Sequence, residues 1–162
     1  MGGELYDLGR GTLKRVWNTR VPVKDLDEAV DFYQEVFGLV LRVDARGENR
    51  AIMGAEDPLG RLELYVPGPG DARQPGGDTG VVFATDSIYD LHRRLVDEGV
   101  NFLLKPEKQP WGAVMVVFED LYGNIFTALE DAEPYQGENK ATPPERKEKD
   151  SGVTIRFVQS KP

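Results

Sequence analysis

The chain alternates between short apolar runs and polar segments that contain glycine, proline, asparagine or aspartate. Apolar runs of about four to eight residues bounded by such turn residues are typical of β-strands, because a helix needs a longer periodic segment. The pattern predicts eight strands, at residues 13–23, 39–43, 50–53, 62–66, 81–85, 101–104, 113–118 and 125–129. Pro22 indicates that the first of them lies at an edge or ends there.

Two segments carry apolar residues at three- and four-residue spacing, which predicts two amphipathic helices. The first begins after Asp25, a good N-cap residue, and ends at Gly38. The second begins after Asp86 or Ser87 and ends at Gly99. Asp86 follows Asp25 by 61 positions, and Gly99 follows Gly38 by the same interval. A single spacing held at both helix ends indicates an internal repeat.

The repeat predicts a single α+β domain at residues 13–130 made of two βαβββ modules, 13–66 and 80–130, with a breaker-rich linker at 67–79. Each module would have a curled sheet with its helix on the convex side. Together the two modules would form an open, mostly antiparallel, barrel-like sheet around a cavity.

Two segments lie outside the repeat. Residues 1–12 are rich in glycine and are expected to form a loose N-terminal arm. Residues 131–162 are expected to form a charged tail: 131–150 have the composition of a solvated linker. Residues 152–158 alternate like a strand that could join a sheet edge of this chain or of a partner.

Composition excludes several classes of function. The net charge is −8, which argues against nucleic-acid binding, because phosphate recognition needs a basic surface. The chain has no cysteine and one histidine, which excludes disulfides, thiol catalysis and a metal site with two histidines. No apolar run is long enough to span a membrane, and the first residues lack the pattern of a signal peptide. We therefore expect a cytoplasmic protein that does not contact membranes.

Three segments carry a resemblance to the vicinal oxygen chelate superfamily, which includes glyoxalases, bleomycin resistance proteins and extradiol dioxygenases. They are VPVKDLDEAVDFYQEVFGL, GVVFATDSIYDLHRRLVDEGV and EDLYGNIFTALE. The last is similar to a family pattern written DPDGN followed by an apolar strand and an acidic residue, with Leu121 and Tyr122 in place of the Pro and Asp. The resemblance implies the fold of two βαβββ modules.

Metalloenzymes of this superfamily hold a divalent ion at four positions, two in each module. By resemblance these positions fall on Asn18, Glu63, Thr127 and a residue near Gly80. Only Glu63 is a strong ligand, so the resemblance does not extend to the metal chemistry. We expect no bound metal, no cofactor and no catalytic residue.

The metal-free bleomycin-resistance branch consists of acidic homodimers that sequester a drug, and its members resemble this chain at QPWG, residues 109–112. In that branch the tryptophan, here Trp111, stacks on the planar part of the ligand. An indole at the rim of a cavity also attracts flat cations by its own chemistry. Glu63 faces opposite to Leu62 and Leu64, so it would point into the cavity. The predicted ligand-binding residues are Asn18, Arg20, Glu63, Tyr65, Trp111, Met115 and Thr127.

The sequence therefore predicts a homodimeric small-molecule-binding protein that sequesters a planar or cationic ligand, such as an antibiotic, without turnover. Arg20 favours an anionic or carbonyl-bearing ligand and so conflicts with a cationic one. The alternative is a lyase, isomerase or dioxygenase of the same fold with displaced metal ligands or metal-independent chemistry. A third hypothesis is an interaction module whose tail strand pairs with a partner.

Overall fold

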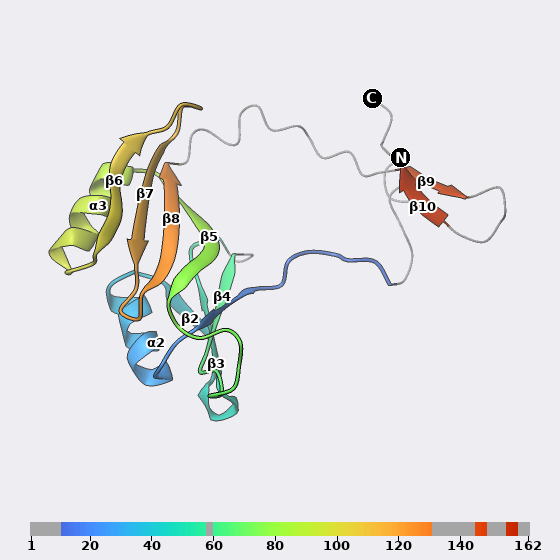
Figure 1. Cartoon of the computed structure of the whole chain (residues 1–162), viewed down its shortest axis with the longest axis horizontal. Helices are drawn as coiled ribbons and strands as arrows, with labels where there is room; N and C mark the ends of the chain where they lie inside the picture. The colour runs from blue at the N-terminus through green and yellow to red at the C-terminus, as the bar shows by residue number, and fades with distance from the viewer. Residues whose placement is uncertain (1–10, 58–59, 131–144, 149–154, 159–162) are drawn as a thin grey trace. The chain divides into compact units, whose positions relative to one another are not determined.

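The computed structural model describes residues 11–57, 60–130, 145–148 and 155–158 (Figure 1). Val16 to Pro134 belong to one compact unit, and the described residues at the two ends of the chain belong to a second. In the second unit, β9 (Glu145–Glu148) and β10 (Ile155–Val158) pair as antiparallel strands. Within the described ranges, neither helix has the length and apolar content of a bilayer-spanning segment.

The larger unit consists of two modules with the same order of elements. The first contains β1 (Thr19–Pro22), α2 (Leu26–Glu35), β2 (Val40–Ala45), the 3₁₀ turn η1 (Arg46–Glu48), β3 (Arg50–Gly54) and β4 (Arg61–Tyr65). The second contains β5 (Gly77–Thr85), α3 (Ile88–Asp97), β6 (Phe102–Lys108), β7 (Val114–Glu119) and β8 (Asn124–Glu130).

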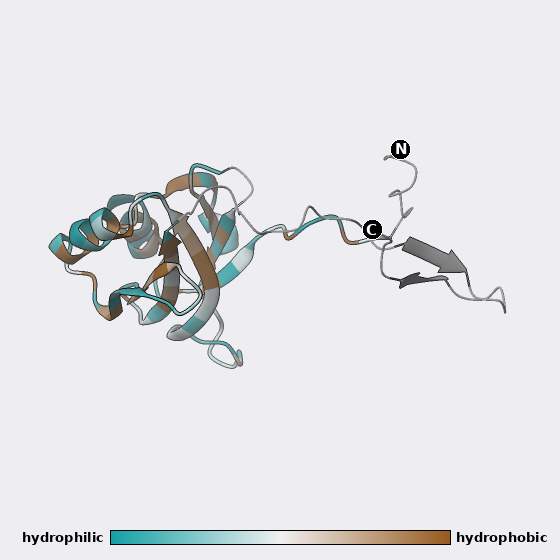
Figure 2. Ribbon diagram, turned by 90° about the horizontal axis from the view of Figure 1, so that it is seen from above, coloured by the Kyte–Doolittle hydropathy of each residue, from teal (hydrophilic) through white to brown (hydrophobic). Residues whose placement is uncertain are grey.

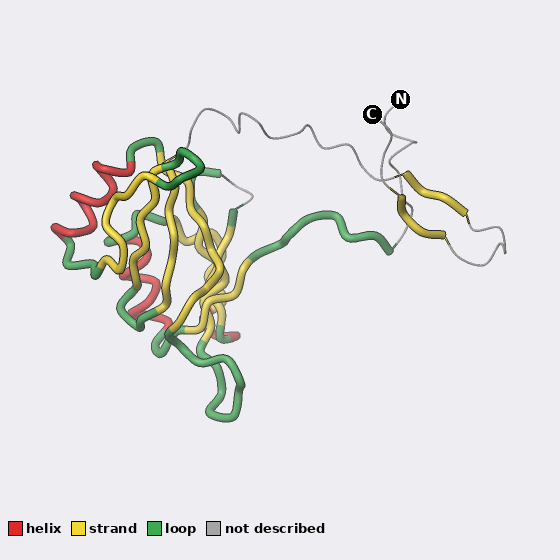
Figure 3. The backbone as a smooth tube through the Cα atoms, turned by 45° about the horizontal axis from the view of Figure 1, so that its top comes forward, coloured by secondary structure: helices red, strands yellow, loops and turns green. Residues whose placement is uncertain are grey.

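Each module forms one four-stranded mixed sheet, and the two sheets have equivalent topology. The strand orders are β1-β4-β3-β2 and β5-β8-β7-β6. The first and fourth strands of each module run parallel, and the other neighbours are antiparallel. This confirms the predicted α+β fold of two βαβββ modules. The sheets are not closed into a barrel, and Figures 1 and 3 show both helices on the same side of them.

The two helices begin at side-chain caps. The Asp25 carboxylate accepts a hydrogen bond from the Glu28 N–H at 2.9 Å, as the capping-box pattern predicts. In α3 the cap is Ser87, whose hydroxyl accepts from the Asp90 N–H. The repeat therefore places its caps 62 positions apart, not 61. Gly38 and Gly99 end the helices with φ values of 77° and 86°, which only glycine adopts without strain.

One hydrophobic core lies between the helices and the sheets and joins the two modules. Figure 2 shows brown segments concentrated in the strands, with the helices carrying both colours. Phe37, which follows α2, packs edge-on against Phe118 and Phe126 of the second module, with ring centroids 5.4 and 5.8 Å apart. The buried members of the core include Val21, Val30, Tyr33, Met53, Leu64, Ile88, Leu95, Val116 and Ala128.

Asp120, in the turn between β7 and β8, is the buried polar centre of the contact between modules. One carboxylate oxygen accepts from the Tyr33 hydroxyl of α2 at 2.6 Å and from the Asn124 amide at 2.8 Å. The other accepts from the backbone N–H groups of Tyr122 and Asn124. The Asn124 amide also donates to the Pro22 carbonyl at the end of β1. The turn segment EDLYGN thus connects the second module to both α2 and β1.

Two tyrosines at this contact have altered acidity. Burial, together with the charge of Asp120 and the hydrogen bond to it, raises the pKa of Tyr33 well above its usual value. Tyr122 donates to the Asp25 carbonyl and to Glu28. Its pKa is also raised, first by burial and then by Glu28. Both phenols therefore stay protonated in the folded protein beyond the pH at which free tyrosine ionises.

Several sequence predictions need correction. The first strand covers Thr19–Pro22, not 13–23, because a strand forms only where β4 supplies hydrogen-bond partners. Leu13, Val16 and Trp17 are exposed instead. The residues of β9 were predicted as linker, and the paired part of the predicted terminal strand is Ile155–Val158. Residues 131–144 and 149–154 lie outside the described ranges.

His92 on α3 is followed in the sequence by Arg93 and Arg94, which are exposed, but the histidine itself is half-buried. Its Nε2 atom is buried without a hydrogen-bond partner. The ring packs edge-on against Phe102 at 4.6 Å. His92 is thus an aromatic packing residue between α3 and β6.

Replacing Asp120 should destabilise the fold strongly. Asp120→Ala removes an acceptor that serves four donors and leaves buried N–H and O–H groups unsatisfied, so we expect a loss of about 3 kcal/mol or more. Urea unfolding followed by circular dichroism measures it. Asp71→Ala is the matched control, because Asp71 is exposed and accepts one loop N–H; it should cost less than about 1 kcal/mol. Equal effects of the two variants would contradict the role of Asp120.

Stability should decrease above pH 10, the usual pKa of tyrosine in an unfolded chain. Because the folded state raises the pKa of Tyr33, its contribution is complete below this pH. It is lost as the pH rises, by up to about 1.4 kcal/mol per pH unit. Urea unfolding between pH 9 and 11 should show that Tyr33→Phe has a shallower decline than the unmodified chain. Parallel curves would show that Tyr33 ionises normally.

Candidate functional site

Glu63 on β4 is held by two side chains from β1 and from the segment just before it. Its Oε1 atom accepts a hydrogen bond from the Asn18 amide at 2.8 Å. Its Oε2 atom accepts from the Arg20 Nε–H at 3.3 Å, which is also an ion pair. The parallel pairing of β1 with β4 places Arg20 directly beside Glu63. Both carboxylate oxygens of Glu63 are therefore occupied by donors from the same module.

Arg20 is also stacked on an aromatic ring. Its guanidinium carbon lies 3.8 Å from the centre of the Tyr65 ring. Tyr65 is buried, whereas 55% of the Arg20 side chain is exposed. The guanidinium is thus held over the Tyr65 ring with its Nε edge against Glu63, and about half of the side chain remains exposed.

Alternation along β4 explains why these groups face away from the helices. Leu62 and Leu64 belong to the core, so Glu63 and Tyr65 lie on the opposite face of the sheet. Across the sheet, Glu63 pairs with Ile52, which is buried but outside the core cluster. Glu63 thus faces opposite to Leu62 and Leu64, and its direction into a ligand cavity stays a prediction.

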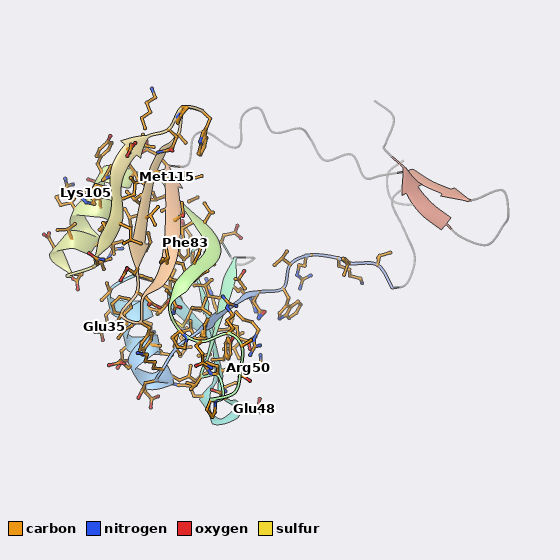
Figure 4. All side chains as sticks on the ribbon, viewed as in Figure 1. Glu35, Glu48, Arg50, Phe83, Lys105 and Met115 are labelled. Atoms are coloured by element: carbon orange, nitrogen blue, oxygen red, sulfur yellow. The ribbon has the colours of Figure 1, made fainter. Side chains whose placement is uncertain are left out.

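Four further arginines surround this group, and sequence reasoning did not select them. The Arg42 side chain lies across Gly54: a Cβ atom added to Gly54 would come within 2.9 Å of the Arg42 Nε atom. Arg50 and Arg61 precede the core-facing residues Ala51 and Leu62, so alternation directs them to the same open face. Figure 4 labels Arg50 at the start of β3. Arg73 donates to the Arg20 carbonyl at 2.7 Å. Strand parity was the signal that could have identified the first three.

The other predicted site residues lie in the second module. Trp111 is 64% exposed in the turn between β6 and β7, which is closed by a hydrogen bond from Gly112 N–H to Gln109 carbonyl. Met115 on β7 and Thr127 on β8 alternate with core residues and therefore face away from the helices. Figure 4 labels Met115 on β7. Among the described residues, no side-chain hydrogen bond, ion pair or ring contact links these three to the Asn18, Arg20, Glu63 and Tyr65 group.

The donors at the four positions implied by the resemblance do not fit a divalent metal. Glu63 is bound by Asn18 and Arg20, and the Asn18 amide donates to it. Gly80 has no side chain, and Thr127 offers a neutral hydroxyl, which is a weak ligand. Within the described ranges, no three His, Cys, Asp or Glu side chains gather as a metal site would require.

Glu130, the acidic residue that closes the EDLYGNIFTALE pattern, has a structural contact. Its carboxylate accepts the Ile88 N–H at the first turn of α3, at 3.0 Å. A carboxylate at a helix N-terminus is stabilised by the unpaired N–H groups there. This acidic residue therefore connects β8 to α3.

A cavity of about 390 Å³ lies elsewhere, on the helix side of the sheets and between the two modules. Phe37, Phe83 and Phe118 line it, with Glu56 and Asp86 among its polar residues. None of the seven predicted ligand-binding residues lines this cavity. The predicted site is thus an open sheet face, distinct from the gap left by core packing.

The fold and this face define a protein of the glyoxalase and bleomycin-resistance class. The sequence matches the family described as Glyoxalase/Bleomycin resistance protein/Dioxygenase superfamily over residues 15–127. The chain belongs to this superfamily.

Three similar proteins illustrate the match. An uncharacterized protein of Shewanella frigidimarina (strain NCIMB 400) is 31% identical over 118 residues, which are 67% of this chain and 87% of that protein. The crystal structure of a superfamily member from Sphaerobacter thermophilus DSM 20745 has a TM-score of 0.68 at 29% identity, covering 73% of this chain and 98% of that one. TnmS3, an antibiotic binding protein from Streptomyces sp. CB03234, has a TM-score of 0.65 at 27% identity, covering 73% and 96%.

The contact between Arg20 and Glu63 should contribute measurably to stability. A double-mutant cycle with Arg20→Gln and Glu63→Gln is expected to give a coupling energy of about 1 kcal/mol, because Glu63 is nearly buried while Arg20 is half exposed. The matched pair is Arg93 and Asp90, which are both exposed on α3; it should give about 0.3 kcal/mol. Urea unfolding measures both cycles. A coupling no larger than that of the exposed pair would contradict the role of Glu63 as the fixed support of Arg20.

Proposed function

We propose that this protein is a metal-free, small-molecule-binding member of its superfamily that sequesters a planar ligand, such as an antibiotic, without converting it. The observation that carries the proposal is that both carboxylate oxygens of Glu63 already accept hydrogen bonds within the chain. Its two oxygens accept from Asn18 and Arg20, so it supports an arginine in place of an ion. The likeness to the antibiotic-binding protein TnmS3 supports the same function.

The open faces suit a flat ligand. The guanidinium of Arg20 on Tyr65 provides a planar surface that is partly exposed. In the second module, Val82 and Leu103 are 58% and 51% exposed. An apolar sheet face next to a flat polar one can bind the body of a conjugated molecule while fixing its orientation. Trp111, with most of its side chain exposed, would add a stacking contact.

We also propose that the protein acts as a homodimer. Val16, Val82 and Leu103 are apolar side chains of the larger unit with more than half of their surface exposed. Exposed apolar surface of this kind is typical of interfaces. A second copy of the chain would remove them from water.

Native mass spectrometry with 1,4-dihydroxyanthraquinone, a flat and uncharged ring system of the kind found in antibiotics, tests the proposal. We expect a particle of two chains that binds one ligand per chain and releases it with its mass unchanged. Trp111→Ala should weaken binding about five- to tenfold, since an aromatic contact contributes roughly 1 kcal/mol. Tyr89→Ala is the control, because Tyr89 is an equally exposed ring on α3.

Two results would contradict the function. One is a chemically altered ligand, and the other is a divalent metal found at one per chain by elemental analysis of the same preparation. Either would favour an enzyme of the same fold.

A further inference from the structure

The open face of the first sheet has a strong local charge that opposes the charge of the whole chain. The protein carries a net charge of −8. Yet the strand residues directed to this face include Arg20, Arg42 and Arg50 and the carboxylate of Glu63, which pairs with Arg20. Asp44 is not part of this group, because it binds Arg46, which contacts Asp27 on α2. The face is therefore locally cationic.

Local charge decides the character of a ligand in direct contact with a surface. Exposed charges more than about 8 Å apart are largely screened at physiological ionic strength. Distant carboxylates on the helices and loops therefore act weakly at this face. A guanidinium that touches the ligand acts at contact distance, where charge-assisted hydrogen bonds form.

Arg20 is already oriented for such a contact. Its Nε–H donates to Glu63 and its guanidinium lies over the Tyr65 ring, while 55% of the side chain stays exposed and, among the described residues, neither Nη group donates a hydrogen bond. Because the guanidinium is fixed on a buried ring, little side-chain freedom is lost when a ligand binds. Two N–H groups in a plane match the two oxygens of a carboxylate, and the face of the guanidinium that is not against Tyr65 can stack on a conjugated ring.

We infer that the ligand of this face carries an oxyanion, such as a carboxylate or an ionised phenol, next to a planar ring system, and that Arg20 selects it. The inference rests on the proposed function and adds the chemical class of the ligand. It replaces the cationic ligand expected from the tryptophan and from the bleomycin-resistance resemblance. An ammonium group placed here would meet Arg20 and its arginine neighbours, with the Glu63 oxygens already occupied.

The test compares three probes of equal shape: anthracene-2-carboxylate, anthracene-2-carboxamide and 2-(aminomethyl)anthracene. Their affinities for the full chain are measured by isothermal titration calorimetry at low and high salt. We expect the carboxylate to bind about tenfold or more tightly than the amide, with the ammonium weakest. High salt should reduce the affinity of the carboxylate and leave that of the amide nearly unchanged.

Variants identify the residue responsible. Arg20→Gln should weaken carboxylate binding about tenfold or more and amide binding less than about threefold. Arg93→Gln is the matched control, since it removes the same charge from the exposed surface of α3 and should change neither affinity. Arg20→Lys keeps the charge without the planar group and should fall between. If Arg20→Gln is unstable, the double variant with Glu63→Gln removes the unpaired carboxylate and serves in its place.

Each other outcome overturns part of the argument. Equal binding of all three probes would show a planar-ligand site without charge selection, so the inference fails and the proposed function stands. Tighter binding of the ammonium would reverse the inference. Carboxylate binding that survives Arg20→Gln would remove Arg20 as the selecting residue. Absence of binding by every probe would overturn the proposed function together with the inference.

Discussion

The buried carboxylate of Asp120 is the interaction on which the arrangement of the two modules depends. It accepts hydrogen bonds from its own turn and from Tyr33 of the other module, while Asn124 reaches the Pro22 carbonyl at the end of β1. A buried charge is tolerated only when its hydrogen bonds are complete, so the turn and α2 must keep one relative position. That position places the cluster of Phe37, Phe118 and Phe126 in contact and leaves the opposite sheet faces open.

The open face of the first module shows how an inherited fold can present a different chemistry. At the position where metalloenzymes of the superfamily have an acidic ligand, Glu63 supports an arginine. Arg20 pairs with one carboxylate oxygen of Glu63 and lies over the ring of Tyr65. Its guanidinium cation is thus held against two side chains that are mostly buried. In the proposed function, this face recognises an anion on the same strand topology on which the metalloenzymes of the superfamily coordinate a cation.

Much of the fold was predictable because local signals agree with the tertiary arrangement. Asp25 caps its helix as its spacing to Glu28 indicates, and Gly38 and Gly99 have the left-handed conformation expected of helix stops. Prediction failed where tertiary contacts override composition. Residues 13–18 have the composition of a strand but form none, since β4 is only long enough to pair with Thr19–Pro22. His92 lies among arginines in sequence, yet its ring packs on Phe102.

The order of residues along the chain was sufficient to establish the repeat, the helix ends, the family and the direction of Glu63 relative to Leu62 and Leu64, because each depends on residue types and their spacing along the chain. Which side chains meet on the open face was decided by the pairing of β1 with β4, which joins residues more than forty positions apart. The same pairing gathers arginines that are scattered in the sequence, within a chain whose total charge is negative. Total charge is a sum over all residues, whereas a ligand responds to the few charges within contact distance, and only the folded sheet specifies those.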